Sequence, residues 1–436
     1  MWHSRPRLSN LWHSRPRLWN HAGTAGAAVL QACHQRGLEI LSLLMSRVVL
    51  AMSGGVDSSV AAWLLREQGH EVIGLFMRHG QDQPPSSPVK TPDPFSCRGK
   101  AGCCTAADAA DARRVADMFG IPFYVLDFQQ EFARIVDYFV EQYTAGRTPN
   151  PCIVCNTWLK FGKLFDYADR MGAEFVATGH YARLEALSDG QFALCRGRDE
   201  AKDQSYVLFG IQRRLLGRLR FPIGEYRKDE VRQFAERLRL PVAAKRDSQE
   251  ICFVPDQDHA RFVRQHRGAI DTSGEIVTGD GTVVGRHEGF ERFTIGQRKG
   301  LRLAFEAPRY VLRIEPDSHR VVIGTYDELA RNELTAAEAN WLVGAAPCGE
   351  GMGQEGEAES PSADRSTQRG HGCSAPARFR AQVKIRYRSR PALATVEVLP
   401  GDRFRVAFDE PCRGVAPGQA AVCYEDDRVL GGGWIQ

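Results

Sequence analysis

The strongest constraint on the fold is an alternation of short apolar runs and helical patterns that begins at Arg47. Arg47–Met52 and Glu71–Met77 predict two strands, and Val60–Gln68 between them predicts a helix. The alternation continues with a helix over about 105–119, a strand over Phe123–Phe128, helices over Glu131–Tyr143 and Ile153–Met171, and a strand over Phe175–Thr178. Such alternation is typical of a parallel β-sheet that helices cover on both faces. We therefore expect an α/β fold in the first half of the chain.

A Gly-rich loop, Ser53–Ser59 (Ser-Gly-Gly-Val-Asp-Ser-Ser), lies between the first predicted strand and the first predicted helix. Its glycines let the backbone approach an anion, and backbone N–H groups, the helix N-terminus and the Ser hydroxyls can then face a phosphate. It is not a Walker A loop, because no Gly-Lys-Ser/Thr follows. The alternative is a glycine turn in which Ser or Asp caps the helix. The local pattern leaves both interpretations open.

The overall charge gives little support for RNA binding. The 436 residues include 57 Lys and Arg and 53 Asp and Glu. The first 44 residues hold five Arg and one Glu, so 52 basic and 52 acidic residues remain from Met45 onward. Binding to nucleic acid must then rest on local patches. No apolar run reaches the roughly 18 residues that a membrane span needs.

The first 44 residues repeat themselves, because Trp2–Leu8 recurs as Trp12–Leu18. An Arg-rich, acid-poor leader can be a transit peptide, but such leaders are amphipathic helices, and Pro6 and Pro16 interrupt this one. We expect that the protein starts at Met45 and that the preceding residues are a disordered or misassigned extension.

The second half of the chain has a different pattern. Residues from about Phe221 to Pro308 are mixed and rich in glycine turns, and the segments that follow are short and alternating. The expected strands there include Tyr310–Ile314, Val321–Ile323, Ala394–Val398 and Phe404–Phe408. They predict a small antiparallel barrel, interrupted by a disordered insertion at Gly349–Ala377 that has almost no large apolar side chain. We expect three domains, over 45–220, 221–308 and 309–436.

Twelve cysteines are too few for a disulfide scaffold, and without a secretory signal we expect a reducing, cytoplasmic location. Cys152 and Cys155 form a C-x-x-C pair within Thr148–Asn156. Such a pair can be half of a zinc site, a redox pair or two buried side chains, and the spacing does not decide between them. Cys252 lies in Asp247–Pro255. Because cysteine is among the residues most often buried, Cys252 taken alone is expected to be a buried strand residue.

His79 with Cys97, Cys103 and Cys104 forms a second group of soft ligands, of the kind that bind zinc. Its spacing does not provide the four ligands of a structural zinc ion. We therefore expect no metal site there.

Taken in order along the chain, these motifs resemble those of the tRNA-specific 2-thiouridylase family. The resemblance runs from about Arg47 to Trp434 and also includes Thr178–Ala182, Lys202–Tyr206, Thr294–Leu301 and the closing Leu430–Trp434. The Gly-rich loop resembles the pyrophosphate loop of adenine-nucleotide α-hydrolase-like enzymes, which split ATP between the α and β phosphates. The first 44 residues and the insertion lie outside the resemblance.

The resemblance implies a Rossmann-like sheet of that type, a central tRNA-binding domain and a C-terminal barrel. It implies ATP-dependent 2-thiolation of the wobble uridine (U34) of tRNA, by adenylation of the C2 oxygen and sulfur transfer from a protein persulfide. Cys155 is then the expected nucleophile, and Cys252 carries the persulfide and forms a transient disulfide with Cys155. Some members have Asp at the place of Cys152, so Cys152 is not expected to be required. Arg302 stands where many members have Gly, so the local turn there is not assigned.

The resemblance also assigns binding residues. The expected ATP site consists of Ala51, Met52, Ser53, Gly54, Gly55, Val56, Asp57, Ser58, Met77 and Gly179. The expected tRNA contacts are His180, Lys202, Asp203, Gln204, Arg386, Tyr387 and Gln419. We expect ATP with Mg²⁺ as a substrate, no bound prosthetic group, and no membrane partner. The expected partners are the tRNAs for Lys, Glu and Gln and a sulfur-donor protein such as a cysteine desulfurase or relay protein.

A run of basic residues in the β-rich part offers separate support for RNA. Lys384, Arg386, Arg388 and Arg390 fall at every second position and in a strand would line one face, opposite Val383, Ile385 and Tyr387. Four like charges on one face favour a track for RNA phosphates. The alternative is a solvated edge strand guarded by its charges.

Two other functions remain as alternatives. Another pyrophosphate-loop enzyme, such as a 4-thiouridine or cytidine thiolase or an amidotransferase-type synthetase, would lack Cys155 and Cys252 in these settings. A non-catalytic RNA-binding protein would not need an intact Ser53, Asp57 and cysteine pair. ATP-dependent release of pyrophosphate with added tRNA distinguishes an enzyme from a binding protein.

Overall fold

The computed structural model describes residues 46–79, 105–247, 251–254, 258–268, 270–301, 303–343 and 378–436. The expectations about the first 44 residues, Cys97, Cys103, Cys104, Arg302 and Gly349–Ala377 lie outside the described residues. Arg47–Gln436 form one compact unit. No helix in the described part of the chain is long and apolar enough to cross a membrane.

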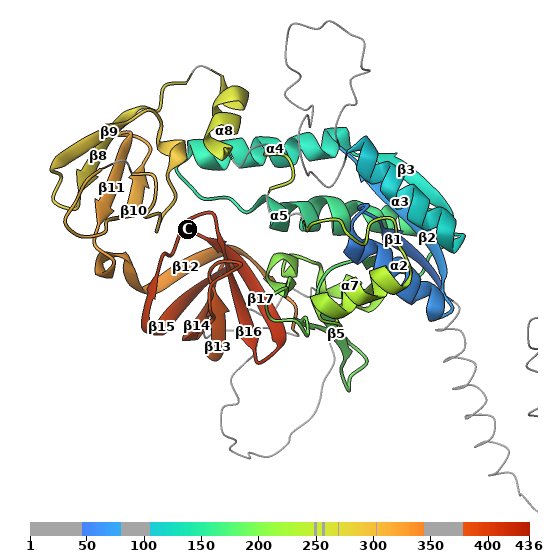
Figure 1. Ribbon diagram of the computed structural model, residues 1–436. Helices are drawn as coiled ribbons and strands as arrows, with labels where there is room; N and C mark the ends of the chain where they lie inside the picture. Colours follow the sequence, from blue (N-terminus) through green and yellow to red (C-terminus); the bar gives the residue numbers. More distant parts are fainter. Residues whose placement is uncertain are drawn as a thin grey trace, which may run out of the picture. The chain divides into compact units, whose positions relative to one another are not determined.

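The first half of this unit is built on a parallel sheet (Figure 1). Its strand order is β3-β2-β1-β4-β7, and every neighbouring pair is parallel. The strands are β1 (Arg47–Ala51), β2 (Glu71–Arg78), β3 (Phe123–Asp127), β4 (Phe175–Thr178) and β7 (Leu219–Arg220). The predicted α/β fold is confirmed.

Helices cover both faces of this sheet because successive side chains of β1 point to opposite sides. Val48 and Leu50 pack with apolar residues of three helices, α2 (Val56–Glu67), α3 (Ala106–Phe119) and α7 (Lys228–Arg237). Val49 and Ala51 pack on the other face with α6 (Phe161–Arg170). The four-residue run Val48–Ala51 is buried from both sides, which explains why the sequence shows a continuous apolar run there.

The helix predicted over Ile153–Met171 has three consecutive segments, which are α5 (Pro151–Val154), the π-helical η1 (Cys155–Lys160) and α6. Thr157 Oγ1 donates a hydrogen bond of 3.0 Å to the carbonyl of Ile153 within this stretch. π-Helical turns are rare and are frequently found at functional sites. The preceding helix is α4 (Gln129–Thr144), whose apolar face includes Phe132 and Phe139.

A mixed four-stranded sheet follows, in the order β10-β11-β8-β9. It contains β8 (Gly274–Thr278), β9 (Val283–His287), β10 (Tyr310–Glu315) and β11 (Arg320–Gly324), and α8 (His259–Arg267) precedes it. The prediction that the strands at Tyr310–Ile314 and Val321–Ile323, now β10 and β11, belong to the barrel is wrong. β11 pairs with β8, and Val311, Val321 and Ile323 share a core with Ile276. An alternation of apolar and polar residues predicts a strand but does not show which strand it pairs with.

The C-terminal part is a closed antiparallel barrel of six strands, because β12 pairs with both β15 and β17. The predicted barrel is thus confirmed. Its strands are β12 (Ala330–Trp341), β13 (Arg378–Lys384), β14 (Ala392–Leu399), β15 (Arg403–Arg413), β16 (Ala420–Glu425) and β17 (Arg428–Ile435). A hairpin of β5 (Ala182–Ala186) and β6 (Phe192–Arg196) extends the sheet beyond β17 (Figure 1). Short helical turns complete the described chain: η2 (Ser205–Leu208), η3 (Arg213–Arg218), η5 (Phe290–Arg292) and η6 (Asp327–Leu329).

The closing Gly-Gly-Gly-Trp motif has a packing role in β17. A Cβ on Gly433 would lie 2.6 Å from the carbonyl oxygen of Ala337, and a Cβ on Gly432 would lie 2.7 Å from that of Ala421. Real side chains cannot approach backbone so closely, so these positions need glycine. The ring of Trp434 lies edge-on to that of Phe209, with 6.2 Å between the ring centroids, and packs against the core that includes Val49 and Leu164.

Candidate active site

A cleft of about 1190 Å³ lies at the carboxyl ends of β1 and β4. Segments that are far apart in the sequence meet in it. They contribute residues that include Ser53, Asp57, Cys152, Gly179, Ile251, Tyr387 and Arg388. In open α/β sheets ligands bind at this edge, where loops leave the strands. The cleft is therefore the candidate active site.

The Gly-rich loop forms the floor of the cleft and is held in a tight conformation. Gly54 has a φ of +70°, and a Cβ there would lie 2.2 Å from the carbonyl oxygen of Asp108. Ser58 Oγ accepts a hydrogen bond of 3.1 Å from the backbone N–H of Ser53 and so closes the loop. Gly179, directly after β4, faces the loop, where a Cβ would lie 2.8 Å from the nitrogen of Ser58. Both glycines are needed because the backbone elements touch.

The start of α2 can bind an anion. Its N-cap, Gly55, provides no side-chain hydrogen bond to the first turn. The first N–H groups of a helix have no partner within the helix, and the helix dipole places positive charge there. The interpretation of the loop as an ordinary turn capped by a Ser or Asp side chain at the N-cap therefore does not fit the geometry.

Asp57 is the acidic residue of this loop, and a lysine and a tyrosine hold it. Lys228 Nζ lies 2.7 Å and 2.9 Å from its two carboxylate oxygens. The hydroxyl of Tyr181 donates a third hydrogen bond of 2.8 Å to the same carboxylate. Burial, reinforced by the neighbouring charge of Asp57, raises the pKa of Tyr181 well above its usual value, so the tyrosine stays a hydrogen-bond donor.

A second lysine braces the loop from the other side. Lys245 Nζ donates to the carbonyl of Gly54 at 2.9 Å and pairs with Asp108 at 2.5 Å and Asp111 at 2.8 Å. Burial lowers the pKa of Lys245, but the hydrogen bonds that its ammonium group donates to Asp108 and Asp111 outweigh this effect and raise the pKa overall. The ammonium group therefore stays charged beside the loop.

The remaining expected ATP residues provide the framework of this floor. Ala51 ends β1, Met52 follows it and both are buried, and the backbone N–H of Met52 donates to the carbonyl of Leu75 in β2 at 2.8 Å. Val56 is buried and lines the cleft. Met77, near the end of β2, is half-buried between two apolar clusters. The structure thus brings the predicted ATP residues together, while their contact with ATP stays a prediction.

The two predicted reactive cysteines pack against one apolar cluster. Cys155 is the first residue of the π-helical segment η1 and is half-buried. Cys252 is also half-buried and lies between Ile251, which lines the cleft, and the buried Phe253. Both contact the cluster that contains Phe139 and Phe253. The six cysteines in the described part of the chain form no disulfide.

Cys152 differs from these two because it is exposed and lines the cleft itself. It lies in α5, three residues before Cys155, where Asn150 caps the helix by accepting from the N–H of Ile153 at 3.4 Å. The Cys155 segment is anchored from below, since Asn156 Nδ2 donates to the carbonyl of Val207 at 3.0 Å. These contacts hold the segment that carries Cys152 and Cys155 in place.

Of the expected tRNA contacts, Lys202 and Tyr387 have side chains suited to reach a ligand in the cleft. Both line it, and Lys202 Nζ lies 2.8 Å from Asp247 Oδ2. Asp203 also borders the cleft, but its buried carboxylate accepts hydrogen bonds from the backbone N–H groups of Gly197 and Ser205. Gln204 Oε1 accepts from the N–H of Tyr181 at 3.0 Å. Asp203 and Gln204 thus hold the surrounding chain in place.

His180 and Gln419 are likewise buried. His180 Nδ1 lies 2.7 Å from Thr178 Oγ1, and burial, with the nearby charge of Lys160, lowers the pKa of His180 well below its usual value. Gln419 Nε2 donates to the carbonyls of Thr148 and Pro149 at 2.9 Å and 3.3 Å. Gln419 therefore fixes the loop that precedes the cysteine pair. RNA contacts by either residue stay a prediction.

The prediction of a continuous basic strand is wrong. β13 ends at Lys384, and the following residues turn because Ser389 binds the backbone of Arg386 through its N–H and its hydroxyl. Arg386 Nη2 donates instead to the carbonyls of Ile295 and Gly414 at 2.6 Å and 2.7 Å. Lys384, Tyr387, Arg388 and Arg390 still line the cleft, from the end of the strand and the turn. An alternating pattern does not reveal where a strand ends.

No group of three or more His, Cys, Asp or Glu side chains in the described part of the chain has an arrangement suited to a metal ion. His79, which belongs to the group of soft ligands compared with a zinc site, is buried and stacks on Phe132 with 3.7 Å between the ring centroids.

Lys228 and Lys245 are central to the site, but neither lies in a recognisable sequence motif. Lys228 is the first residue of a helix whose amphipathic pattern is ordinary, and Lys245 lies in an irregular segment. The fold brings their ammonium groups to the loop from 171 and 191 residues away.

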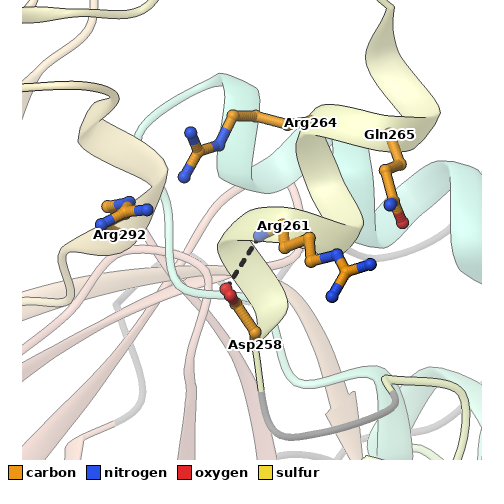
Figure 2. Close-up of a pocket in the computed structure, with 5 residues that line it drawn as sticks. All are labelled: Asp258, Arg261, Arg264, Gln265 and Arg292. Atoms are coloured by element: carbon orange, nitrogen blue, oxygen red, sulfur yellow. Dashed lines mark hydrogen bonds between the residues drawn. The ribbon is translucent and has the colours of Figure 1, made fainter.

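A second cavity, of about 330 Å³, lies beside α8 (Figure 2). It is lined by Asp258, Arg261, Arg264, Gln265 and Arg292. The Asp258 carboxylate accepts from the backbone N–H of Arg261 at 2.9 Å and so caps α8. None of the predicted site residues lines this cavity, so it does not belong to the candidate active site.

A parallel sheet, a Gly-rich loop at a helix N-terminus and flanking lysines place the chain in the class of α/β nucleotide-binding enzymes. Three family models match it in order: a tRNA methyl transferase HUP domain over residues 46–256, a tRNA methyl transferase PRC-barrel domain over 260–325, and an aminomethyltransferase β-barrel domain over 367–435.

Full-length relatives identify the family. A tRNA-specific 2-thiouridylase MnmA of Rhodopirellula baltica is 51% identical over 412 residues, which cover 90% of this chain and 96% of that protein. Proteins of the same name from Geobacter metallireducens and Acidithiobacillus ferrooxidans are 46% and 45% identical, over 89% of this chain and 96% and 98% of theirs. The chain belongs to the tRNA-specific 2-thiouridylase family.

Proposed function

We propose that this chain makes 2-thiouridine at U34 of tRNA by adenylating the uridine and then transferring sulfur to it within a single cleft. Membership of the family supports the overall reaction. The observation that carries the mechanism is that the Gly-rich loop, Cys152 and Ile251 line one cleft, while Cys155 and Cys252 pack on one cluster beside it.

The first step concerns ATP, whose phosphates would lie on the Gly-rich loop. The start of α2 offers N–H donors, and Lys228 and Lys245 supply the ammonium groups that the loop itself does not contain. The C2 oxygen of uridine forms a bond to the α phosphorus, the bond to the β phosphate breaks, and pyrophosphate leaves. The Asp57 carboxylate is an oxygen ligand of the kind that Mg²⁺ prefers, and the bound ion would neutralise phosphate charge.

The second step replaces the activated oxygen by sulfur. The outer sulfur of a persulfide on Cys252 forms a bond to C2, and AMP leaves with the oxygen. The Cys155 thiolate then attacks the sulfur of Cys252, the S–S bond of the persulfide breaks, and its electron pair stays on the sulfur attached to uridine. A Cys155–Cys252 disulfide remains, which a thiol reductant must open before the next cycle. A cysteine desulfurase or relay protein would restore the persulfide.

The tRNA would enter over the turn after β13 and the segment around Lys202. Arg388, Arg390 and Lys202 line the cleft and can bind backbone phosphates. The wobble base must leave its stack to reach the cysteines. We propose the tRNAs for Lys, Glu and Gln as substrates, a cytoplasmic location, and a division into a catalytic segment (45–220), a tRNA-binding centre and a barrel.

Nucleoside mass spectrometry of tRNA from cells with and without the gene tests this function. We expect 2-thiouridine to disappear from position 34 without the gene and to return with the intact gene, while a gene encoding Asp57→Ala does not restore it. Unchanged 2-thiouridine in the deletion strain would reject the proposal. ATP-dependent pyrophosphate release that requires tRNA separates the enzyme from a non-catalytic RNA-binding protein.

A further inference from the structure

A row of ion pairs connects the proposed tRNA side of the cleft with the Gly-rich loop. Lys202 Nζ lies 2.8 Å from Asp247 Oδ2, and Asp247 Oδ1 lies 2.8 Å from Lys228 Nζ. Lys228 in turn contacts both oxygens of Asp57 at 2.7 Å and 2.9 Å. We call these four residues, Lys202, Asp247, Lys228 and Asp57, the ionic row.

The two middle members of the row are shielded from water. The side chains of Lys228 and Asp247 are 11% and 19% exposed, compared with 33% for Lys202 and 32% for Asp57 at the ends. Partial burial strengthens such pairs and makes an unpaired charge costly. Burial raises the pKa of Asp247, but hydrogen bonds from Lys202 and Lys228 outweigh it and lower the pKa to about 2. Asp247 therefore stays ionised and needs cations beside it.

Each end of the row faces one of the two substrates. Lys202 lines the cleft, where an RNA phosphate can bind it, and Asp57 lies in the loop that would hold the phosphates of ATP. A phosphate that takes Lys202 removes one cation from Asp247. Lys228 is the next cation in the row, so its contact with Asp247 strengthens at the expense of its contact with Asp57. The Asp57 carboxylate then becomes available to the cation that accompanies ATP.

The same exchange runs in the opposite direction. When a cation bound to ATP takes over the Asp57 carboxylate, Lys228 turns to Asp247 and Lys202 is released toward the RNA. Arg232 Nη2 also contacts Asp247 Oδ1, at 2.7 Å, and keeps one positive charge beside it throughout. We propose that the ionic row makes the binding of tRNA and of MgATP mutually cooperative, with Asp247 and Lys228 as positioning residues. This inference rests on the proposed function of the cleft.

Thermodynamic linkage gives the proposal a sharp test, because each substrate must change the affinity for the other by the same factor. We would measure by calorimetry the Kd of an ATP analogue that cannot be cleaved between the α and β phosphates, with Mg²⁺, with and without saturating tRNA. In the wild-type protein, tRNA should tighten this Kd by about 5-fold or more, the lower end of ordinary coupling energies. The tRNA Kd should tighten equally when the analogue is present.

Asp247→Asn interrupts the row while keeping the size of the side chain, so it should abolish most of the coupling. Lys202→Gln should do the same from the exposed end, and it guards against misfolding of the first variant. Asp427→Asn is the matched control, because Asp427 also lines the cleft but pairs with Arg183 outside the row. It should keep the wild-type coupling.

Full coupling in both row variants would overturn the proposal, as would a wild-type analogue Kd that does not respond to tRNA. Failure of the proposed function would look different, because the wild-type protein would then not bind the analogue or the tRNA.

Discussion

Cys155 and Cys252 share an apolar surrounding, whereas Cys152 is exposed on the wall of the cleft. The proposed chemistry needs one thiol to carry sulfur and a second to release it. Cys155→Ser and Cys252→Ser should therefore each reduce thiolation of tRNA to background, and Cys152→Ser should retain much of it. Thiolation by the purified variants, measured as 2-thiouridine per tRNA, checks this. Equal loss in all three would show that the roles are assigned to the wrong cysteines.

His180 should make stability depend on pH. Burial lowers the pKa of His180 in the folded protein, whereas an unfolded histidine binds a proton near pH 6.5. The unfolded state therefore binds more protons at low pH. The contribution of His180 to the free energy of unfolding is complete above about pH 6.5 and decreases as the pH falls below that value. In His180→Gln this contribution is missing. Urea unfolding between about pH 5 and 7 should show a shallower pH dependence for the variant, and parallel curves would contradict the assignment.

At the residue scale, the sequence predicted some members of this site and missed others. The Gly-rich loop and the cysteines were recognisable because each lies in a contiguous motif. Lys228 and Lys245 carry no such signal, since their role comes from distances across the fold. The predicted RNA contacts Gln419 and Arg386 also donate hydrogen bonds to backbone carbonyls, while their contact with RNA stays a prediction. A polar residue in a motif can serve the substrate or the scaffold, and burial is needed to decide.

At the level of elements, the turn after β13 should carry part of the RNA affinity. Arg388→Ala with Arg390→Ala should weaken tRNA binding, and each lost phosphate contact should lower the salt slope by roughly 0.7 to 0.9. The matched control is Arg378→Ala with Arg380→Ala in β13 itself, where both arginines pair with carboxylates and do not line the cleft.

The control should leave the slope near that of the wild type. An unchanged slope in the turn variant would mean that these arginines are ordinary surface charges. Docking of tRNA would then have to be sought elsewhere on the chain.

Elements were predicted well where one stretch of sequence defines them. The five-strand sheet has every neighbour parallel, as the strand–helix alternation indicated. The sequence could not show that β10 and β11 join β8, because a strand pattern is the same whichever edge it pairs with. Nor could it show the π-helical segment at Cys155, since the six residues Cys155–Lys160 are too few for a change of helical period to be recognised.

At the level of the whole molecule, the fold described here begins at Arg47. A protein that starts at Met45 should therefore fold, bind ATP and thiolate tRNA like the full chain. Thermal unfolding and thiolation rates of the two forms, compared side by side, check this. Loss of either property in the shorter form would show that residues 1–44 belong to the enzyme.

The central claim is that loop and cysteines act on the same uridine in one cleft. Its most direct test is a single turnover in which Cys252 carries a persulfide with isotopically labelled outer sulfur, in the presence of tRNA and MgATP. The account predicts labelled 2-thiouridine at position 34, one AMP and one pyrophosphate for each, and a Cys155–Cys252 disulfide in the protein. Labelled product without ATP, or product whose sulfur is unlabelled, would contradict it.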